Sequence, residues 1–311
     1  MTDVIAYFPG QGAQHVGMLA DIANDYPIVQ QTFAEASDAI GFDLWQLVQD
    51  GPAETLNITY NTQPALLTAS VAVWRVVQAQ CPALNVTAAA GHSLGEYSAL
   101  VAAKAIDFAD AVRLVKRRGE LMEAAVPAGQ GGMAAILGLD DEQIVAVCQA
   151  ASAAGVVEPA NFNAPGQIVI AGDMAGIEAA LPIAKEQGAK RALPLAVSGP
   201  FHSSLMKAAA AEFEVALQAI QWRAAAFPVF HNVDNQPATL ETIPAKLLAQ
   251  LYSPVNWTGA VQATRASAEL AVEFGPGKVL AGLNKRIDKT LDTHSTNDLA
   301  AVQRVIQLIQ G

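Results

Sequence analysis

Residues 91–95 read Gly-His-Ser-Leu-Gly, and their central serine is the strongest candidate for chemistry in the chain. A short apolar stretch at 86–90 precedes them and a run of helix formers at 96–105 follows, which indicates a strand, a tight turn and a helix. A glycine on each side of Ser93 permits a strained turn that exposes the hydroxyl to a substrate. The pattern favours a nucleophile at Ser93, and a serine that only caps a helix is the alternative.

A serine nucleophile needs a base beside it, and histidine is the commonest one. His92 is adjacent to Ser93 in sequence, so its side chain is expected to point elsewhere in the turn and to pack. His202 follows a Gly-Pro turn and opens a helix, from where it can face a cleft. We therefore favour His202 as the base. His15 and His231 remain possible bases, although each has an ordinary position in a loop or at a strand end. His294 lies in a polar stretch of the tail and is expected to be solvated.

Arg118 lies on a predicted helix that begins at Asp107 and runs to about residue 125. At 100° per residue, apolar side chains share one face of this helix and charged ones share the other. Arg118 falls in the middle of the apolar face. It is either a snorkelling side chain, the partner of a buried carboxylate, or a receptor for an anion in a cleft, where a guanidinium can bind a carboxylate through two parallel hydrogen bonds.

The elements that position these residues indicate an α/β fold with a parallel, hydrolase-like main sheet. Strands are expected at 4–8, 86–90, 227–232 and 270–274, helices at 27–50 and 62–79, and a turn at 254–257. Residues 133–196 alternate as β-α-β-β-α-β, the ferredoxin-like order. We therefore predict a large domain at 1–127 and 198–311, with a small ferredoxin-like domain at 128–197 inserted into it. A cleft between the two is the expected pocket.

Composition excludes several classes of function. The 311 residues carry 18 basic and 29 acidic side chains, a net charge of −11, which argues against nucleic-acid binding. No apolar run is long enough to span a membrane, and the first residues lack a basic region, so we expect a cytoplasmic protein without membrane association. Two cysteines, Cys81 and Cys148, suit a reducing compartment and lack the spacing of metal ligands. Nothing in the sequence indicates an exposed interface, so a monomer is expected.

The chain resembles the malonyl-CoA:acyl-carrier-protein transacylases of bacterial type II fatty-acid synthesis over essentially its whole length. The motifs that carry the resemblance stand at 8–12, 62–65, 91–96, 132–135, 161–163, 199–203 and 275–277. The resemblance implies the same two-domain α/β fold. It also implies ping-pong transfer of a malonyl group from malonyl-CoA to the thiol of acyl carrier protein, through a malonyl ester on serine and with no cofactor.

Site residues carry over from the family by position. Ser93 matches the nucleophile, His202 the base, and Arg118 the arginine that pairs with the malonyl carboxylate. The resemblance gives the remaining roles as follows: backbone N–H groups of Gln11 and Leu94 for the oxyanion, the main-chain carbonyl of Gln250 for orienting the base, Phe201 for limiting room at the α-carbon, and Asn161, Asn163, Gln167 and Arg191 for the CoA side. His92 is placed with the substrate-binding residues, with packing as its alternative.

The family's carrier proteins are acidic, so an acidic enzyme needs a local basic surface to dock one. Candidates for this basic rim are Lys190, Arg191, Lys285, Arg286 and Lys289, with plain solvated charges as the alternative. Two other functions stay open. One is a free-standing acyltransferase of a polyketide synthase, and the other is a serine esterase, although the late histidine of the esterase order is missing except at His294.

Overall fold

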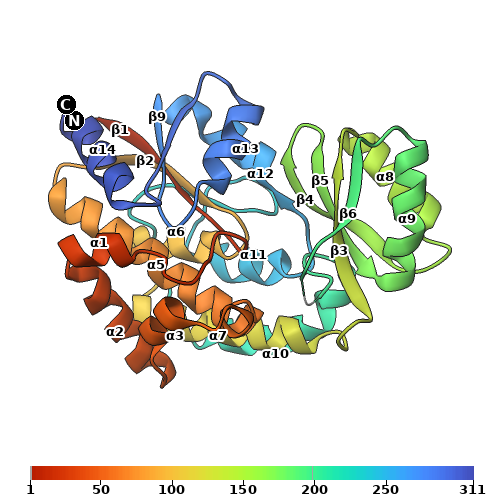
Figure 1. The fold of residues 1–311 in the computed structure, drawn as a ribbon, viewed down its shortest axis with the longest axis horizontal. Coiled ribbons are helices and arrows are strands. Elements are labelled where there is room, and N and C mark those ends of the chain that lie inside the picture. The colour runs from red at the N-terminus through yellow and green to blue at the C-terminus, as the bar shows by residue number, and fades with distance from the viewer. Residues whose placement is uncertain (1, 198) are drawn as a thin grey trace.

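A computed structural model describes residues 2–197 and 199–311, which fold into two unequal lobes (Figure 1). The larger lobe holds a five-stranded parallel sheet in the order β10-β9-β1-β2-β7. Its strands are β1 (Asp3–Phe8), β2 (Asn85–Gly91), β7 (Val229–Phe230), β9 (Leu270–Glu273) and β10 (Asp292–Ser295). The α/β class with a parallel sheet is therefore as the sequence predicts.

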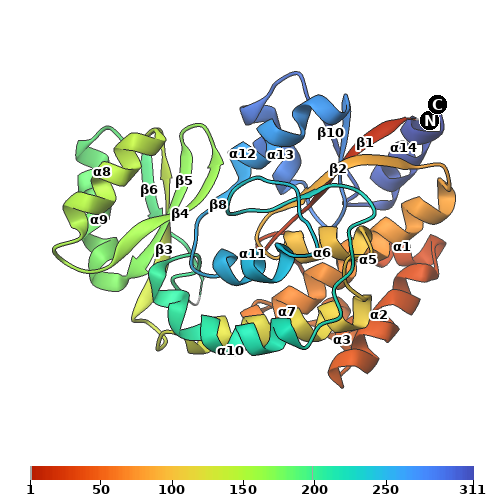
Figure 2. The same ribbon diagram turned by 180° about the vertical axis from the view of Figure 1, so that it is seen from behind.

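Strand β1 is apolar without alternation because both faces of the sheet are covered. Val4, Ala6 and Phe8 pack into one core with the helices around α5, whereas Ile5 and Tyr7 pack into a second core with α12 and α13. Figure 2 shows these helix layers from behind. The helices of the larger lobe are α1 (Ala20–Asp25), α2 (Ile28–Ile40), α3 (Leu44–Asp50), α4 (Ala53–Leu56), α5 (Thr59–Gln80), α6 (Gly95–Ala102), α7 (Phe108–Ala124), α10 (Lys207–Gln218), α11 (Ile243–Gln250), α12 (Trp257–Thr264), α13 (Val279–Ile287) and α14 (Leu299–Gln310).

The smaller lobe is built from β3 (Gly131–Leu137), α8 (Asp141–Ala151), β4 (Val157–Ala164), β5 (Gln167–Asp173), α9 (Met174–Glu186) and β6 (Arg191–Pro194). Its sheet has the order β6-β3-β5-β4-β8, in which the first four strands follow the ferredoxin-like arrangement. The fifth strand, β8 (Val255–Asn256), pairs parallel with β4. It comes from outside the segment 128–197, where the sequence predicts only a turn. Ser198, our predicted point of return to the large domain, lies outside the described residues, as does Met1.

Other sequence expectations are corrected in detail. The helical region 27–50 is interrupted at Gly41, whose φ of 76° is left-handed, and so forms α2 and α3. The strand predicted at 227–232 covers only Val229–Phe230. His294, expected in a solvated tail, lies in β10, which pairs with β9 at the edge of the main sheet. An edge strand reading Asp-Thr-His-Ser has no apolar run that could reveal it.

Candidate active site

Ser93 lies two residues beyond β2, at the carboxyl end of the parallel sheet, where open α/β sheets bind ligands. Its φ of 51° is left-handed, a strained conformation for a residue with a side chain. The two flanking glycines make the turn possible. A Cβ on Gly91 would lie 1.8 Å from the carbonyl carbon of Gly95, and one on Gly95 would lie 2.0 Å from the oxygen of Phe8. The turn therefore holds the serine hydroxyl at the start of α6.

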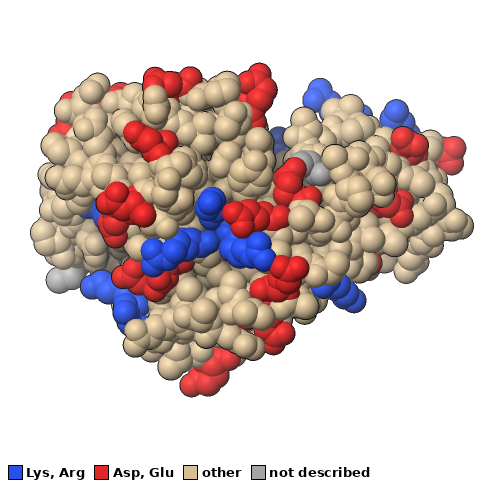
Figure 3. Space-filling view, turned by 90° about the horizontal axis from the view of Figure 1, so that it is seen from below, with Lys and Arg blue, Asp and Glu red and all other residues tan. Residues whose placement is uncertain are grey.

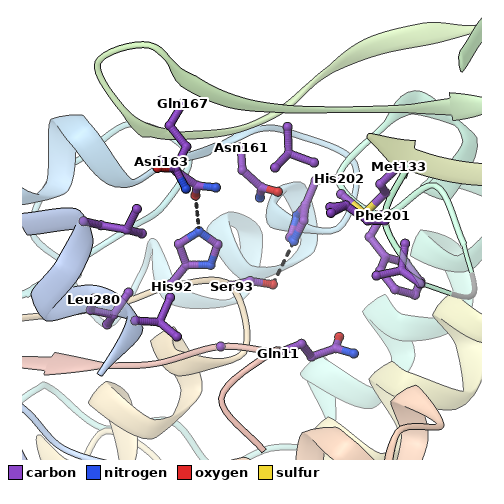
Figure 4. Close-up of a pocket in the computed structure, with 16 residues that line it drawn as sticks. Gln11, His92, Ser93, Met133, Asn161, Asn163, Gln167, Phe201, His202 and Leu280 are labelled. Atoms are coloured by element: carbon purple, nitrogen blue, oxygen red, sulfur yellow. Dashed lines mark hydrogen bonds between the residues drawn. The ribbon is translucent and has the colours of Figure 1, made fainter. Parts of the chain in front are cut away.

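His202 lies against this hydroxyl, with its Nε2 2.7 Å from Ser93 Oγ (Figure 4). Its Nδ1 is 2.8 Å from the main-chain oxygen of Gln250, which can only accept, so Nδ1 carries the ring proton and Nε2 presents its lone pair to the serine. Like Ser93, His202 has a left-handed φ, of 61°. Burial, reinforced by the Arg118 charge, lowers the pKa of His202 to about 3, so the imidazole is neutral at pH 7.

Arg118 is fully buried and reaches the same hydroxyl. Its Nη2 donates to Ser93 Oγ at 3.2 Å and to Gln250 Oε1 at 2.9 Å, and its Nη1 donates to Gln63 Oε1 at 2.8 Å. Its Nε has no partner within the described part of the chain, and no carboxylate there lies within 4.0 Å of the guanidinium. Arg118 is thus a buried cation held by neutral groups, next to the candidate nucleophile.

The position of Arg118 follows from the packing of α7 against α5. A Cβ on the next residue, Gly119, would lie 2.5 Å from the Cα of Tyr60, so only glycine allows the two helices to approach this closely. The neighbouring Arg117 points outward and forms an ion pair with Glu212 at 2.6 Å. Of the two adjacent arginines, the one that the helical periodicity places on the apolar face is therefore the one at the site.

A cavity of about 210 Å³ opens beside Ser93, between the two lobes. It is lined by His92, Ser93, Phe201 and His202, by Gly10 and Gln11, by Met133, Asn161, Asn163, Gln167 and Val169 of the smaller lobe, and by Leu195, Val197, Val279, Leu280 and Leu283. Asn161, Asn163 and Gln167, which the resemblance assigns to the CoA side, all lie in the wall of this cavity. Arg191 instead lines a neighbouring open hollow with Lys190 and Arg286.

His92 does not simply pack away from the site. Its ring contacts that of Trp257, with the ring centroids 5.8 Å apart, and its Nε2 lies 2.7 Å from Asn163 Oδ1 across the cavity (Figure 4). Burial lowers the pKa of His92, so it is neutral at pH 7. This hydrogen bond joins the serine turn of the larger lobe to β4 of the smaller one.

Gln11 and Leu94 lie on two sides of the serine turn. Gln11 follows β1 and lines the cavity, and Leu94 directly follows the nucleophile at the start of α6. Within the described residues, no hydrogen bond occupies the backbone N–H of either residue. The strands are brought together by Gly10, where a Cβ would lie 2.4 Å from the oxygen of His92. Two unoccupied N–H groups at this place can hold an oxyanion.

Several side chains at the site escaped the sequence analysis. Asn232 accepts the backbone N–H of Ser93 at 2.7 Å, Glu96 is buried three residues after the nucleophile, and the side chain of Gln250 contacts Arg118 in addition to its main chain contacting the base. Of these three residues, Glu96 alone carries a signal in the sequence, because it is a charged residue on an otherwise apolar helix after the serine. His231, an alternative base in the sequence analysis, is bound to this glutamate at 2.8 Å. His15 lies near its own loop, 3.5 Å from Ala13 O.

The described residues offer no metal site, disulfide or membrane-spanning helix beside this arrangement. In residues 2–197 and 199–311 no three His, Cys, Asp or Glu side chains are grouped as a metal would need. Both cysteines are buried free thiols. None of the described helices is long and apolar enough to cross a membrane. What the arrangement can do is nucleophilic substitution at a carbonyl, with a carboxylate receptor beside the nucleophile.

Comparison with known proteins places the chain in a family. The acyl transferase domain family matches residues 7–302. The malonyl CoA-acyl carrier protein transacylase of Escherichia coli K12 is 54% identical over 313 residues, covering 99% of this chain and 100% of that one. A crystal structure of an acyl carrier protein S-malonyltransferase from Vibrio cholerae is 53% identical with a TM-score of 0.94, covering 98% and 100% of the two chains. A malonyl-transacylase in complex with its type II polyketide-synthase acyl-carrier protein is 50% identical, with a TM-score of 0.96 and coverage of 99% and 100%.

Proposed function

The chain belongs to the acyl transferase domain family, among its malonyl-CoA:acyl-carrier-protein transacylases, and we propose that it transfers malonyl groups through an ester on Ser93. The reaction supplies malonyl-acyl carrier protein for fatty-acid synthesis. The observation that carries the proposal is the buried Arg118 guanidinium, 3.2 Å from the serine hydroxyl and without a carboxylate partner among the described residues. A malonyl group on that oxygen brings the missing carboxylate.

The first half-reaction begins when Ser93 Oγ attacks the thioester carbonyl of malonyl-CoA while its proton passes to His202 Nε2. The backbone N–H groups of Gln11 and Leu94 hold the tetrahedral oxyanion. When the intermediate collapses, the C–S bond breaks and the imidazolium returns its proton to the departing CoA thiolate. The carbonyl of Gln250 stabilises this imidazolium in place of the usual carboxylate.

The second half-reaction is the first in reverse, with the phosphopantetheine thiol of acyl carrier protein as the nucleophile. His202 removes the thiol proton, sulfur attacks the malonyl ester, and Ser93 leaves with a proton from the imidazolium. These steps use only side-chain and backbone groups of the protein and the two substrates, so the reaction as written needs no cofactor. We further propose that the enzyme acts as a monomer in the cytoplasm, where its two buried thiols stay reduced.

The two lobes contribute different parts of the proposed site. The larger lobe, assigned to 1–127 and 198–311, carries the serine, the base and the arginine. The smaller lobe, assigned to 128–197, contributes the wall of Asn161 and Asn163 and closes the cavity. Phe201, buried beside the base, limits space at the α-carbon of the acyl group and so favours malonyl over methylmalonyl.

The acidic carrier protein is proposed to dock on the basic rim. Lys190, Arg191 and Arg286 line one open hollow of about 570 Å³, and among the described residues that line it Asp140 alone is acidic. Arg286 donates to Gln167 Oε1 at 3.1 Å, and Gln167 also lines the active cavity. The hollow thus borders the path that the pantetheine arm must take.

Another face of the molecule is a poorer dock. Figure 3 shows Lys and Arg side chains in the middle of the lower face, with Asp and Glu side chains around them. The arginines of α7 are examples of basic side chains that are already paired, with Arg113 bound to Asp110 at 2.6 Å and Arg117 to Glu212 at 2.6 Å. Paired charges give a weaker positive potential, which favours the basic rim.

Polyketide synthesis is the second candidate for the pathway that the enzyme serves. The match to a malonyl-transacylase bound to a polyketide-synthase carrier protein favours such a partner as the alternative acceptor. The same residues would perform the same steps, so only the carrier protein differs. A serine esterase is the third reading, in which water takes the place of the carrier thiol.

Steady-state kinetics with malonyl-CoA and holo-acyl carrier protein test the proposal. We expect CoA release that depends on carrier protein and parallel lines in double-reciprocal plots. In Ser93→Ala, kcat should fall by at least about 10³-fold. Carrier proteins from fatty-acid and polyketide systems, tested in parallel, identify the acceptor through kcat/KM. CoA release at the same rate without any carrier protein would indicate an esterase and contradict the proposal.

A further inference from the structure

Glu96 is a fully buried carboxylate that the mechanism above does not use. It lies in the first turn of α6, three residues after the nucleophile, and is 1% exposed. Its Oε2 accepts from the side-chain Nε2 of Gln250 at 2.6 Å and from the backbone N–H of Asn232 at 3.1 Å. Its Oε1 lies 2.8 Å from His231 Nδ1. Burying a carboxylate is costly unless hydrogen bonds satisfy it, and three groups do so here.

Gln250 connects Glu96 to all three functional residues, and its contact with Ser93 is a hydrogen bond from Nε2 to the main-chain oxygen at 3.1 Å. Its main-chain oxygen holds Nδ1 of His202 at 2.8 Å, and its side-chain Oε1 accepts from Arg118 Nη2 at 2.9 Å. The amide has two orientations of similar shape, and the wrong one would turn its NH₂ group toward the guanidinium. A carboxylate can only accept hydrogen bonds, so Glu96 holds the NH₂ group on its own side and the carbonyl on the side of Arg118. Ser93 O at 3.1 Å and Asn232 Oδ1 at 3.3 Å accept from the same NH₂ group at longer range.

Asn232 gives Glu96 a second connection to Ser93. Its Oδ1 accepts the backbone N–H of Ser93 at 2.7 Å, and its Nδ2 donates to Gly91 O at 2.7 Å. The backbone N–H of Asn232 is bound to Glu96. The same carboxylate therefore also anchors the side chain that fixes the strained serine turn.

We infer that Glu96 is a positioning residue that orients the Gln250 amide and thereby sets the direction of Arg118, so that it controls selection of acyl groups that end in a carboxylate. This inference rests on the proposed malonyl transfer. Glu96 touches neither substrate nor reacting atoms and acts through Gln250. Loss of the serine anchor alone would slow every acyl group equally, whereas loss of the Arg118 orientation affects only malonyl.

Two substitutions separate these effects. Glu96→Ala removes the shortest hydrogen bond of the Gln250 NH₂ group, at 2.6 Å, and leaves it only the longer ones to Ser93 O and Asn232 Oδ1, so the orientation of the amide is held less firmly. Glu96→Gln keeps the hydrogen bonds, because its carbonyl can accept from Gln250 and Asn232 while its NH₂ donates to His231 Nδ1. The imidazole proton of His231 then lies on Nε2, which faces Thr242 Oγ1 at 3.2 Å. The glutamine variant therefore preserves orientation and serves as the conservative rescue.

The experiment measures kcat/KM for malonyl-CoA and for acetyl-CoA with the same holo-acyl carrier protein. For Glu96→Ala we expect malonyl transfer to fall by about 100-fold and acetyl transfer by about tenfold, so the malonyl-to-acetyl ratio falls about tenfold. Glu96→Gln should keep the ratio of the unmodified protein. Glu178→Ala, at an exposed position on α9, is the reference for a surface change. Equal loss for both acyl groups in Glu96→Ala, or loss of the ratio in Glu96→Gln, overturns the inference.

A double mutant tests the route. Gln250→Leu keeps the main-chain carbonyl for His202 but removes the side-chain links to Arg118 and to Ser93 O. The lost contact with Ser93 should slow both acyl groups alike, so the ratio should fall as it does in Glu96→Ala. The double variant should lower it no further, because both changes break one connection. Additive losses would contradict the route. If Glu96→Ala does not fold, Glu96→Asp replaces it: the shorter side chain withdraws the carboxylate from Gln250, and an unchanged ratio would again overturn the inference.

These outcomes are distinct from failure of the proposed function. If the unmodified protein does not transfer malonyl, the proposed function itself is wrong. If it transfers malonyl with a high malonyl-to-acetyl ratio and Glu96→Ala or Glu96→Asp keeps that ratio, only the role of Glu96 is wrong.

Discussion

Replacing Arg118 by methionine is the perturbation that addresses malonyl selection most specifically. The guanidinium is fully buried and donates to Ser93 Oγ, so a carboxylate on the acyl group lies within its reach. Two unit charges about 4 Å apart interact by about 4 kcal/mol at an effective dielectric constant of about 20. That energy corresponds to about 10³-fold in kcat/KM. Methionine keeps much of the length of the side chain and removes the charge.

The assay is transfer to holo-acyl carrier protein from malonyl-CoA and, separately, from acetyl-CoA. Arg118→Met should lower kcat/KM for malonyl by about 10³-fold and leave acetyl unchanged or raised, because acetyl carries no carboxylate. Thermal stability should change little. Removal of an unpaired buried cation is favourable, and it offsets the cost of leaving the amide oxygens of Gln63 and Gln250 without their donor.

Arg117→Met is the matched control, one residue away on the same helix. Arg117 is 45% exposed on its side chain and paired with Glu212, so its loss should leave both activities unchanged. Full malonyl transfer by Arg118→Met, or an equal loss for malonyl and acetyl, would refute the reasoning.

Three further predictions concern acyl size, pH and docking. Phe201→Ser should raise kcat/KM for methylmalonyl relative to malonyl by about 10–100-fold, the value of one methyl group in a tight pocket; an unchanged ratio in competition assays would show that Phe201 does not limit the α-carbon. Because the pKa of His202 is about 3 in the folded protein and 6.5 in an unfolded chain, the unfolded chain binds more protons between these values, and stability is lost as pH falls from about 6.5 toward 3. In denaturant titrations His202→Gln should lack this part of the decline, which is worth up to about 1.4 kcal/mol per pKa unit, and an identical pH dependence in both proteins would contradict it. Reversing charge at Lys285 and Arg286 to glutamate should raise the KM for acyl carrier protein about tenfold and spare the acylation rate with malonyl-CoA, whereas equal effects on both would place docking elsewhere.

Much of the fold and the core of the site could be predicted because the signals are local. The two glycines around Ser93 are needed within one turn, and the structure shows each in contact with backbone. Arg118 stood out because helical periodicity alone placed a cation on an apolar face. The alternation of strands and helices in residues 133–196 likewise marks the order of the smaller lobe before any contact is known.

What could not be predicted depends on contacts between distant segments. Glu96, Asn232 and the Gln250 side chain are ordinary polar residues in sequence, and only folding brings them into one network across 154 positions between Glu96 and Gln250. Strand β8 is two residues long and pairs across lobes, and β10 is a polar edge strand, so neither carries a hydrophobic pattern.

The most direct test of the account is to trap the acyl-enzyme. The protein is mixed with malonyl-CoA, quenched with acid and digested, and the peptides are analysed by mass spectrometry before and after addition of holo-acyl carrier protein. We predict a malonyl ester on Ser93 that disappears on addition of carrier protein as the malonyl group appears on the phosphopantetheine thiol. Absence of the ester, or release of malonate to water at a rate that carrier protein does not change, would contradict the account.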